Sequence, residues 1–266
     1  MINMVVNHPE VERRDLCSLA GVLYGASPMP EAVIRRAMEV LPQTGFSQAY
    51  GQTEASPILT MLRPEHHTVD PASPHAGRIG SAGQAIPGVE LAVLDENDRP
   101  VATGEVGEVC ARGPNVMLGY RNLPEQTEAT LRRGWLHTGD GGRLDADGFL
   151  HIVDRMKDMI VTGGENVYSA EVEDAVHQHP AVEQCAVIGV PDDTWGERVH
   201  AVVCLKPGAD ADAEAIIEHC RTRIAGFKCP RSVSFRDEPL PLSGAGKILK
   251  TDLRAPFWRE RDRQVG

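Results

Sequence analysis

Five consecutive residues, Tyr50-Gly51-Gln52-Thr53-Glu54, place an aromatic ring, a hydroxyl and a carboxylate directly after an apolar run. The run from Phe46 to Tyr50 predicts a strand, and ligands of open α/β sheets collect where such strands end. There the Thr53 hydroxyl could donate to a phosphate oxygen, and Glu54 could hold the Mg²⁺ ion that accompanies ATP. The Tyr50 ring could stack on adenine. Taken alone, the segment also fits an ordinary strand-to-turn connection.

Two further segments offer groups that suit a nucleotide. The small residues of Tyr24-Gly25-Ala26-Ser27-Pro28 end another predicted strand and would let a flat base approach the backbone, although a plain tight turn explains them equally well. Asp140 follows Thr138-Gly139, where its carboxylate could accept both vicinal hydroxyls of a ribose. An aspartate in that setting is otherwise a turn former.

The second half of the chain carries a glycine pair and an isolated cation. Thr162-Gly163-Gly164-Glu165-Asn166-Val167 is a glycine loop that lacks the Walker pattern of a phosphate cradle. Ser243-Gly244-Ala245-Gly246-Lys247 ends in a lysine that could reach a developing phosphoester charge, or could simply be a surface lysine. The charged run from Ile152 to Asp158 lies where the composition changes, and such a run is commonly a solvated linker.

The elements that must position these groups change in type along the chain. A strand at 19–24, expected to be buried, a helix at 30–41 and a strand at 46–50 form a βαβ-like piece. From 89 to 153 short apolar runs alternate with turn signals, interrupted by a helix from Pro124 to Leu131, which predicts a small antiparallel sheet or barrel. A compact α+β unit follows, with helices at 169–178 and 212–225 and strands at 185–190, 199–205 and 232–236. Ser169 is expected to cap its helix, and Ile216, Ile217, Cys220 and Ile224 to form a buried stripe.

Composition excludes several classes of protein. With 38 acidic and 27 basic residues the formal charge is −11, which argues against nucleic acid as a partner. The six cysteines show no CxxC pair or metal-site spacing, so we expect buried free thiols in a reducing compartment. No apolar run approaches the length of a transmembrane segment, and no secretory signal is recognisable. We therefore expect a cytoplasmic protein.

In their order along the chain these motifs resemble the adenylate-forming superfamily, specifically the AMP-producing fatty-acid and related acyl-CoA synthetases. The resemblance covers essentially the whole chain. It rests on Tyr50–Glu54, Gly113-Pro114 with Gly119-Tyr120, Thr138–Asp140, Asp154-Arg155 with Gly163–Val167, Val190-Pro191-Asp192 with Trp195-Gly196-Glu197, and Gly246-Lys247.

The resemblance implies a role for each matching position. Gly25, Ala26 and Tyr50 would enclose adenine, Thr53 would contact phosphate, Glu54 would bind Mg²⁺, Asp140 and Arg155 would hold the ribose, and Ser27, Gly51 and Ile152 would complete the nucleotide site. Lys247 would be the adenylation lysine and Lys157 the hinge about which a small domain rotates. Gly163 and Gly164 would line the tunnel for the thiol of coenzyme A, with Trp195 and Lys228 either near the CoA or in purely structural roles.

The implied reaction joins a carboxylic acid, of fatty-acid type, to CoA through acyl-AMP, with ATP, Mg²⁺ and CoA as the small molecules bound. The implied fold is multidomain, α/β and α+β. Residues 1–155 would be the C-terminal portion of the large adenylation domain, with an α/β piece at 1–88 and a β-rich, barrel-like piece at 89–155. Residues 156–266 would be the small mobile C-terminal domain.

One departure from the family concerns the phosphate loop. Members carry a Ser/Thr/Gly-rich loop ending in Pro-Lys-Gly ahead of all these motifs, and this sequence has none. We therefore expect a truncated ligase whose first sheet exposes apolar edges and can self-associate. Two alternatives stay open: a non-catalytic or split-enzyme module that binds adenylate or CoA, and, less favoured, an amino-acid-activating domain of a peptide synthetase.

Overall fold

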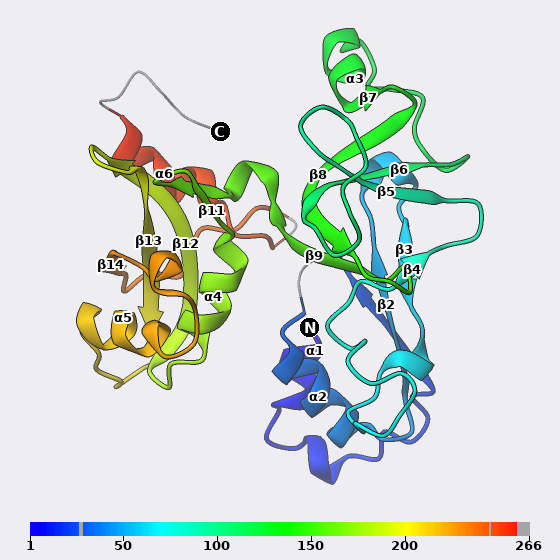
Figure 1. Ribbon diagram of the computed structural model, residues 1–266. Coiled ribbons are helices and arrows are strands. Elements are labelled where there is room, and N and C mark those ends of the chain that lie inside the picture. The colour runs from blue at the N-terminus through cyan, green and yellow to red at the C-terminus, as the bar shows by residue number, and fades with distance from the viewer. Residues whose placement is uncertain (27–28, 245, 260–266) are drawn as a thin grey trace. The chain divides into compact units, whose positions relative to one another are not determined.

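The computed structural model describes residues 1–26, 29–244 and 246–259, and the chain divides into two compact units, Met1–Ile152 and Val153–Gly266. Both units mix helices with sheets (Figure 1). The predicted fold class, α/β and α+β in several domains, is confirmed. In the part of the chain that the structure describes, no helix is both long and apolar enough to cross a membrane.

The first sheet of unit 1 contains the predicted βαβ piece. Strand β1 (Gly21–Gly25) runs parallel to β2 (Gly45–Tyr50), and helix α2 (Glu31–Val40) connects them. The antiparallel strands β3 (Thr60–Leu62) and β4 (Gln84–Ala85) extend the sheet on the other side of β2. Ile34 and Ala37 of α2 pack with Phe46 and with Val6 of α1 (Ile2–Val6). Three short 3-10 turns complete this region: η1 (Val11–Arg13), η2 (Thr53–Ala55) and η3 (Pro64–His66).

The prediction that residues 19–24 form a buried strand is wrong in one respect. Within the described sheet β1 has a neighbour on the β2 side alone, so it is an edge strand. Tyr24 is buried, but Leu23 is 62% exposed and Leu19 is also exposed. An edge strand with exposed leucines is a ready surface for pairing with another chain.

The second sheet of unit 1 is antiparallel and corresponds to the predicted β-rich piece. Its strands follow the order β5 (Glu90–Leu94), β6 (Gly107–Arg112), β8 (Trp135–Leu144) and β7 (Leu131–Arg132), and β9 (Leu150–Arg155) also pairs with β8. Helix α3 (Pro124–Thr130) precedes β7 and matches the predicted helix within a residue. The division between the two units falls inside β9, after Ile152.

Unit 2 is built on one sheet with helices on both faces. Its elements in chain order are η4 (Met156–Asp158), β10 (Ile160–Thr162), β11 (Glu165–Val167), α4 (Ser169–His177), β12 (Val182–Asp192), β13 (Gly196–Leu205), α5 (Ala213–Arg221), η5 (Gly226–Lys228), β14 (Ser232–Phe235) and α6 (Lys250–Trp258). The strand order is β11-β10-β13-β12, with β14 parallel to β13.

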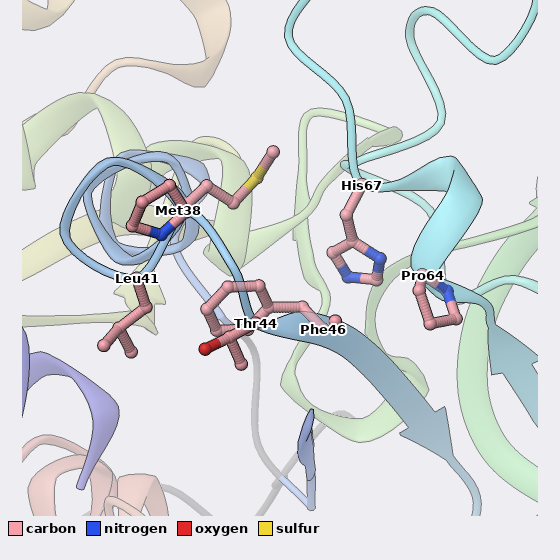
Figure 2. Close-up of a pocket in the computed structure, with 8 residues that line it drawn as sticks. Met38, Leu41, Thr44, Phe46, Pro64 and His67 are labelled. Atoms are coloured by element: carbon pink, nitrogen blue, oxygen red, sulfur yellow. The ribbon is translucent and has the colours of Figure 1, made fainter. Parts of the chain in front are cut away.

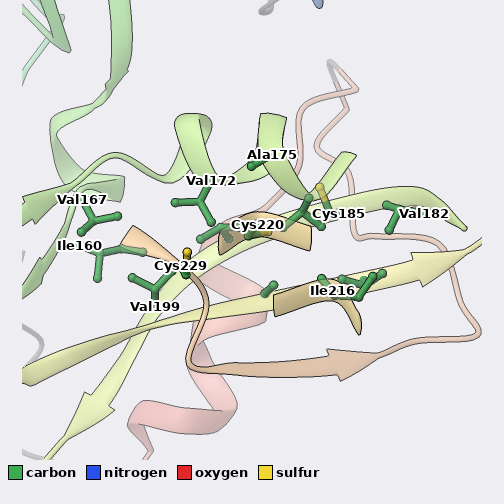
Figure 3. Packing of buried hydrophobic residues seen from close by; sticks show 14 residues of the cluster. Ile160, Val167, Val172, Ala175, Val182, Cys185, Val199, Ile216, Cys220 and Cys229 are labelled. Carbon is green, nitrogen blue, oxygen red and sulfur yellow. The ribbon is translucent and has the colours of Figure 1, made fainter. Parts of the chain in front are cut away.

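Alternate residues of β12 serve two hydrophobic cores. Cys185 and Val187 pack with α4 and α5 through Val172 and Ile216, and Figure 3 shows this cluster from close by. Ala186, Ile188 and Val190 face the other side, where Leu253 of α6 covers them. This division follows from the two-residue period of a strand. In α5 the predicted stripe is fully buried at Ile216 and Cys220, whereas Ile217 is only half-buried.

Ser169 does not cap α4 as expected, because it is the first residue of the helix. Its hydroxyl instead donates to Asp154 Oδ2 over 2.6 Å, and the same oxygen accepts the amide of Ala170 at 3.2 Å. The buried carboxylate of Asp154 therefore takes the place of a cap at the positive end of the helix.

Candidate functional site

The turn after β2 is held in one conformation by backbone packing and by one asparagine. A Cβ atom on Gly51 would lie 2.1 Å from the carbonyl oxygen of Pro57, so only glycine fits there. The amide of Leu59 donates to Tyr50 O at 2.8 Å. Asn115 Nδ2 donates to Ala55 O at 2.8 Å and to Ile58 O at 2.9 Å. The segment that carries Thr53 and Glu54 is thus a fixed turn.

Two tyrosines bind the two carboxylates of interest. Tyr50 Oη donates to Asp140 Oδ2 at 2.8 Å, and Tyr120 Oη donates to Glu54 Oε1 at 2.7 Å. The hydrogen bond to Glu54 raises the pKa of Tyr120, and burial adds to this effect. The structure therefore brings Asp140 of β8 next to Tyr50, the last residue of β2, which lies four residues before Glu54 in the sequence. Tyr120 belongs to a motif that the sequence analysis noted, but its partner could not be seen without the fold.

The end of β1 lies beside the end of β2. Gly25 pairs with Ala49, and a Cβ atom on Gly25 would lie 2.1 Å from Ala49 O. Ala26 follows with a positive φ of 66°. The close neighbouring strand is itself a sufficient reason for glycine at position 25. Ser27 lies outside the described residues, and the Thr53 side chain is exposed.

The remaining candidates lie on β9 and in unit 2. Ile152 is the last residue of unit 1, and Arg155 and Lys157 follow at the end of β9 and in η4. Gly163 and Gly164 form the two-residue turn between β10 and β11, with φ of 61° and 85°. Gly163 N donates to Trp195 O at 2.9 Å. The Arg231 guanidinium lies 4.7 Å from the centre of the Trp195 ring, so an aromatic and a cationic group adjoin the glycine pair.

Substituting the two glycines should separate crowding from backbone strain. A Cβ atom on Gly163 would lie 2.5 Å from the Trp195 ring, whereas one on Gly164 would meet nothing within 4 Å. Both positions require the left-handed region, which costs an alanine about 1 kcal/mol. We expect Gly164→Ala to lower the free energy of unfolding by about that amount and Gly163→Ala to lower it further. Urea unfolding of both variants tests this, and equal losses would contradict the predicted contact with Trp195.

Lys247 lies in a small turn ahead of α6. Leu242 and Ile248 form an isolated bridge, Ser243 N donates to Lys247 O at 2.7 Å, and Lys247 N donates to Ser243 Oγ at 3.1 Å. The lysine side chain is exposed, so the turn is held by main-chain contacts rather than by the ammonium group. Lys228, by contrast, pairs with Glu171 at 2.7 Å.

A hollow of about 190 Å³ lies at the other end of β2, where the strand begins. Figure 2 shows Phe46 and His67 among its lining residues. His67 bonds to Arg63 O at 3.0 Å and to Tyr24 Oη at 2.9 Å, and burial lowers its pKa. A neutral imidazole with both nitrogens engaged is a structural group. This hollow is therefore separate from the candidate site at the end of the strand.

Glu108, Cys110 and His137 are the kind of group that could hold a metal ion. Glu108 Oε2 and His137 Nδ1 are 2.7 Å apart, which is a hydrogen-bond distance. Two such ligands of a tetrahedral zinc ion would be about 3.4 Å apart. Burial raises the pKa of Cys110 to about 12, so its thiol stays protonated. We interpret the three residues as a hydrogen-bonded cluster.

Comparison with known proteins follows the same division of the chain. The family model for AMP-binding enzymes matches residues 1–121, and the model for the AMP-binding enzyme C-terminal domain matches residues 171–247. A feruloyl-CoA synthase of an Amycolatopsis species is 43% identical over 97% of this chain and 50% of its own length. A medium/long-chain fatty-acid–CoA ligase of Mycobacterium tuberculosis is 44% identical over 100% of this chain and 46% of its own length.

Solved structures agree with these matches. The amide bond synthetase McbA of Marinactinospora thermotolerans superposes with a TM-score of 0.84 at 36% identity, covering 96% of this chain and 50% of that one. The o-succinylbenzoate-CoA synthetase MenE of Bacillus subtilis, in complex with its acyl-adenylate intermediate, gives a TM-score of 0.82 at 32% identity, covering 99% and 50%.

The chain therefore belongs to the adenylate-forming superfamily of AMP-binding enzymes, as its motifs predict. It spans about half the length of the curated relatives it matches.

Proposed function

We propose that this chain is part of an AMP-forming acyl-CoA synthetase, an acid–thiol ligase that activates a carboxylic acid of fatty-acid type with ATP and transfers it to CoA. The observation that carries the proposal is the hydrogen bond between Tyr50 and Asp140, which unites two motifs 90 residues apart on the turn that bears Glu54. The names of the relatives, among them fatty-acid–CoA ligases, support the choice of reaction.

The residues of unit 1 fit a nucleotide with its metal ion. In the proposed site Asp140 accepts the ribose hydroxyls, Tyr50 flanks the adenine together with Gly25 and Ala26, and Thr53 donates to phosphate. Glu54 suits Mg²⁺, because that ion is commonly held by one or two carboxylates together with substrate phosphates. MenE has been solved with ATP and magnesium, and MatB of Rhodopseudomonas palustris with ATP, which supports the assignment. Gly51, Ser27 and Ile152 complete the proposed set from unit 1, and Arg155, at the end of β9, is proposed as a further ribose contact.

Unit 2 supplies the groups proposed for charge neutralisation and for the thiol. Lys247 is assigned to adenylation. Its side chain is exposed, and the contacts that stabilise its turn do not involve the ammonium group. Gly163 and Gly164 are assigned to the approach of CoA, beside Trp195 and Arg231. Lys157 is assigned to the hinge, with domains at 1–155 and 156–266. Lys228 is left with a structural role because it pairs with Glu171.

A second candidate function is that of one half of a split enzyme. The exposed Leu23 of β1 and the exposed Leu19 just ahead of that strand favour it, because an edge strand can take up a strand from another polypeptide or from a second copy of this chain. The six cysteines are free, five of them buried and Cys17 exposed, which supports the proposed cytoplasmic location.

Nucleotide binding by the chain itself tests the proposed site. Titration calorimetry should show binding of AMP that Asp140→Ala weakens about tenfold or more, because charged hydrogen bonds are lost. Glu96→Ala, an exposed position in a turn of the same sheet, should leave the affinity unchanged. ATP–pyrophosphate exchange is then measured with the chain alone and with the remaining half of a relative added. Exchange only in the second case identifies a split enzyme, and no AMP binding at all would overturn the proposed site.

A further inference from the structure

Asp140 stands on a bulge of β8. In the ladder between β6 and β8, Glu108 pairs with Gly141 and Cys110 pairs with His137. A single residue of β6, Val109, therefore faces three residues of β8, Thr138, Gly139 and Asp140. Gly139 adopts a positive φ of 71° within this bulge. Bulges of this kind change the direction in which a side chain points, and they leave backbone groups without ladder partners.

Side chains take over the hydrogen bonds that the ladder loses at the bulge. The Gly139 amide donates to Glu108 Oε1 at 3.1 Å. Thr138 Oγ1 donates to Val109 O at 2.6 Å and accepts the Asp140 amide at 3.1 Å. Among these bonds the facing strand, β6, contributes one side chain, the carboxylate of Glu108. That carboxylate and the Thr138 hydroxyl together hold the bulge that carries Asp140.

The second oxygen of the Glu108 carboxylate, Oε2, also has side-chain partners. Glu108 Oε2 lies 2.7 Å from His137 Nδ1 and 3.4 Å from an Arg132 nitrogen. The Glu108 side chain is 19% exposed and that of His137 is 4% exposed. The same arginine binds Asp98 at 3.1 Å, so it bridges two acidic groups. A carboxylate fixed at both oxygens in a mostly buried place is a firm support for the bulge.

We propose that Glu108 is a positioning residue for the nucleotide site: its carboxylate holds the Thr138–Asp140 bulge so that Asp140 faces Tyr50 and the ribose. The inference rests on the proposed function, since it assigns Glu108 an effect on nucleotide affinity exerted through Asp140. Glu108 makes no contact of its own with the nucleotide in this arrangement.

The test compares AMP with 2′,3′-dideoxy-AMP, which lacks the hydroxyls that Asp140 is proposed to accept. The whole chain should prefer AMP about tenfold or more. In Glu108→Ala we expect weaker AMP binding by a similar factor and a preference close to one. Glu108→Gln keeps an oxygen for the Gly139 amide and should restore part of the preference. General loosening of the sheet would instead weaken both ligands equally, and that outcome would overturn the inference.

Two additional measurements keep the inference separate from the proposed function. Glu90→Ala on the adjoining strand β5 removes an exposed pair with Arg112 and should leave the preference unchanged. Hydrogen exchange of the Gly139 amide should be slow in the unaltered chain and at least tenfold faster in Glu108→Ala, whether or not AMP is present. If the unaltered chain fails to bind AMP, the proposed function fails, whereas unchanged Gly139 exchange in Glu108→Ala refutes the positioning role by itself.

Discussion

Replacing Lys247 with alanine should lower the rate of ATP–pyrophosphate exchange about 100-fold or more and leave the unfolding temperature unchanged. Formation of an acyl-adenylate brings a carboxylate and the α-phosphate together, and an ammonium group that bridges both stabilises the charge that builds up. Loss of one such electrostatic contact costs about 100- to 1000-fold in rate. The turn around Lys247 is held by main-chain bonds and by Ser243, so the fold does not need the amine.

The exchange assay uses the form of the protein that supports it, either the chain alone or the chain supplemented with the remaining half of a relative. Lys206→Ala is the matched control, because Lys206 is also an exposed lysine of unit 2. It should keep full exchange activity. AMP binding should persist in Lys247→Ala, since the proposed nucleotide contacts come from other residues. A drop in the unfolding temperature as large as the effect on exchange would show that Lys247 is structural and would contradict the assignment.

Local pattern was sufficient to predict most of the elements. Helix α2 begins after Pro30, and α5 shows its buried stripe at Ile216 and Cys220, because both signals lie within a few residues of one another. The environment of β1 was not predictable in the same way. An apolar run does not show whether both faces of its strand are covered: Tyr24 packs with α2, whereas Leu23 lies on the opposite face of the strand and is exposed. Ser169 is not the cap of α4 because the helix begins at this residue, and the carboxylate that accepts the Ala170 amide, Asp154, comes from another element.

The same distinction between local pattern and tertiary contact applies to the candidate site. Its residues could be selected from short motifs of the sequence. Tyr50 and Glu54 belong to the segment Tyr50–Glu54 at the end of a predicted strand, and Asp140 belongs to the segment Thr138–Asp140. Their partners could not be selected, because the contact between Tyr120 and Glu54 spans 66 residues and depends on tertiary packing. The bulge that carries Asp140 is a matter of register between β6 and β8, which no single strand specifies. The contact between Glu108 and the bulge could therefore not be predicted from the sequence.

Replacing Lys250 with methionine should be the most destabilising of the changes considered in unit 2, with a loss of about 3 kcal/mol at neutral pH. Lys250 Nζ lies 2.7 Å from Glu173 Oε1, and the two side chains are only 13% and 23% exposed. The same carboxylate oxygen accepts the Val187 amide at 2.8 Å. Removing the amine leaves a largely buried carboxylate without its counter-ion, and burial already raises the pKa of Glu173.

The loss should depend on pH in a defined direction. Burial raises the folded-state pKa of Glu173 above its unfolded value, and Lys250 lowers it, so the variant raises that pKa further. A raised pKa of an acid favours folding below the unfolded value and weakens the fold as pH rises through the folded value. The deficit of Lys250→Met should therefore be largest at neutral pH and shrink toward about pH 4.5. Urea unfolding followed by tryptophan fluorescence, to which Trp258, buried in α6, contributes, measures it.

The double variant Glu173→Gln/Lys250→Met separates the buried charge from the loss of packing. Glutamine keeps an oxygen for the Val187 amide but carries no charge, so most of the stability at neutral pH should return and the added pH dependence should vanish. The methionine fills much of the volume of the lysine stem in both variants, which makes them a matched pair. If the double variant were as unstable as Lys250→Met at neutral pH, the contact of Lys250 with Ser169 rather than the charge of Glu173 would account for the loss.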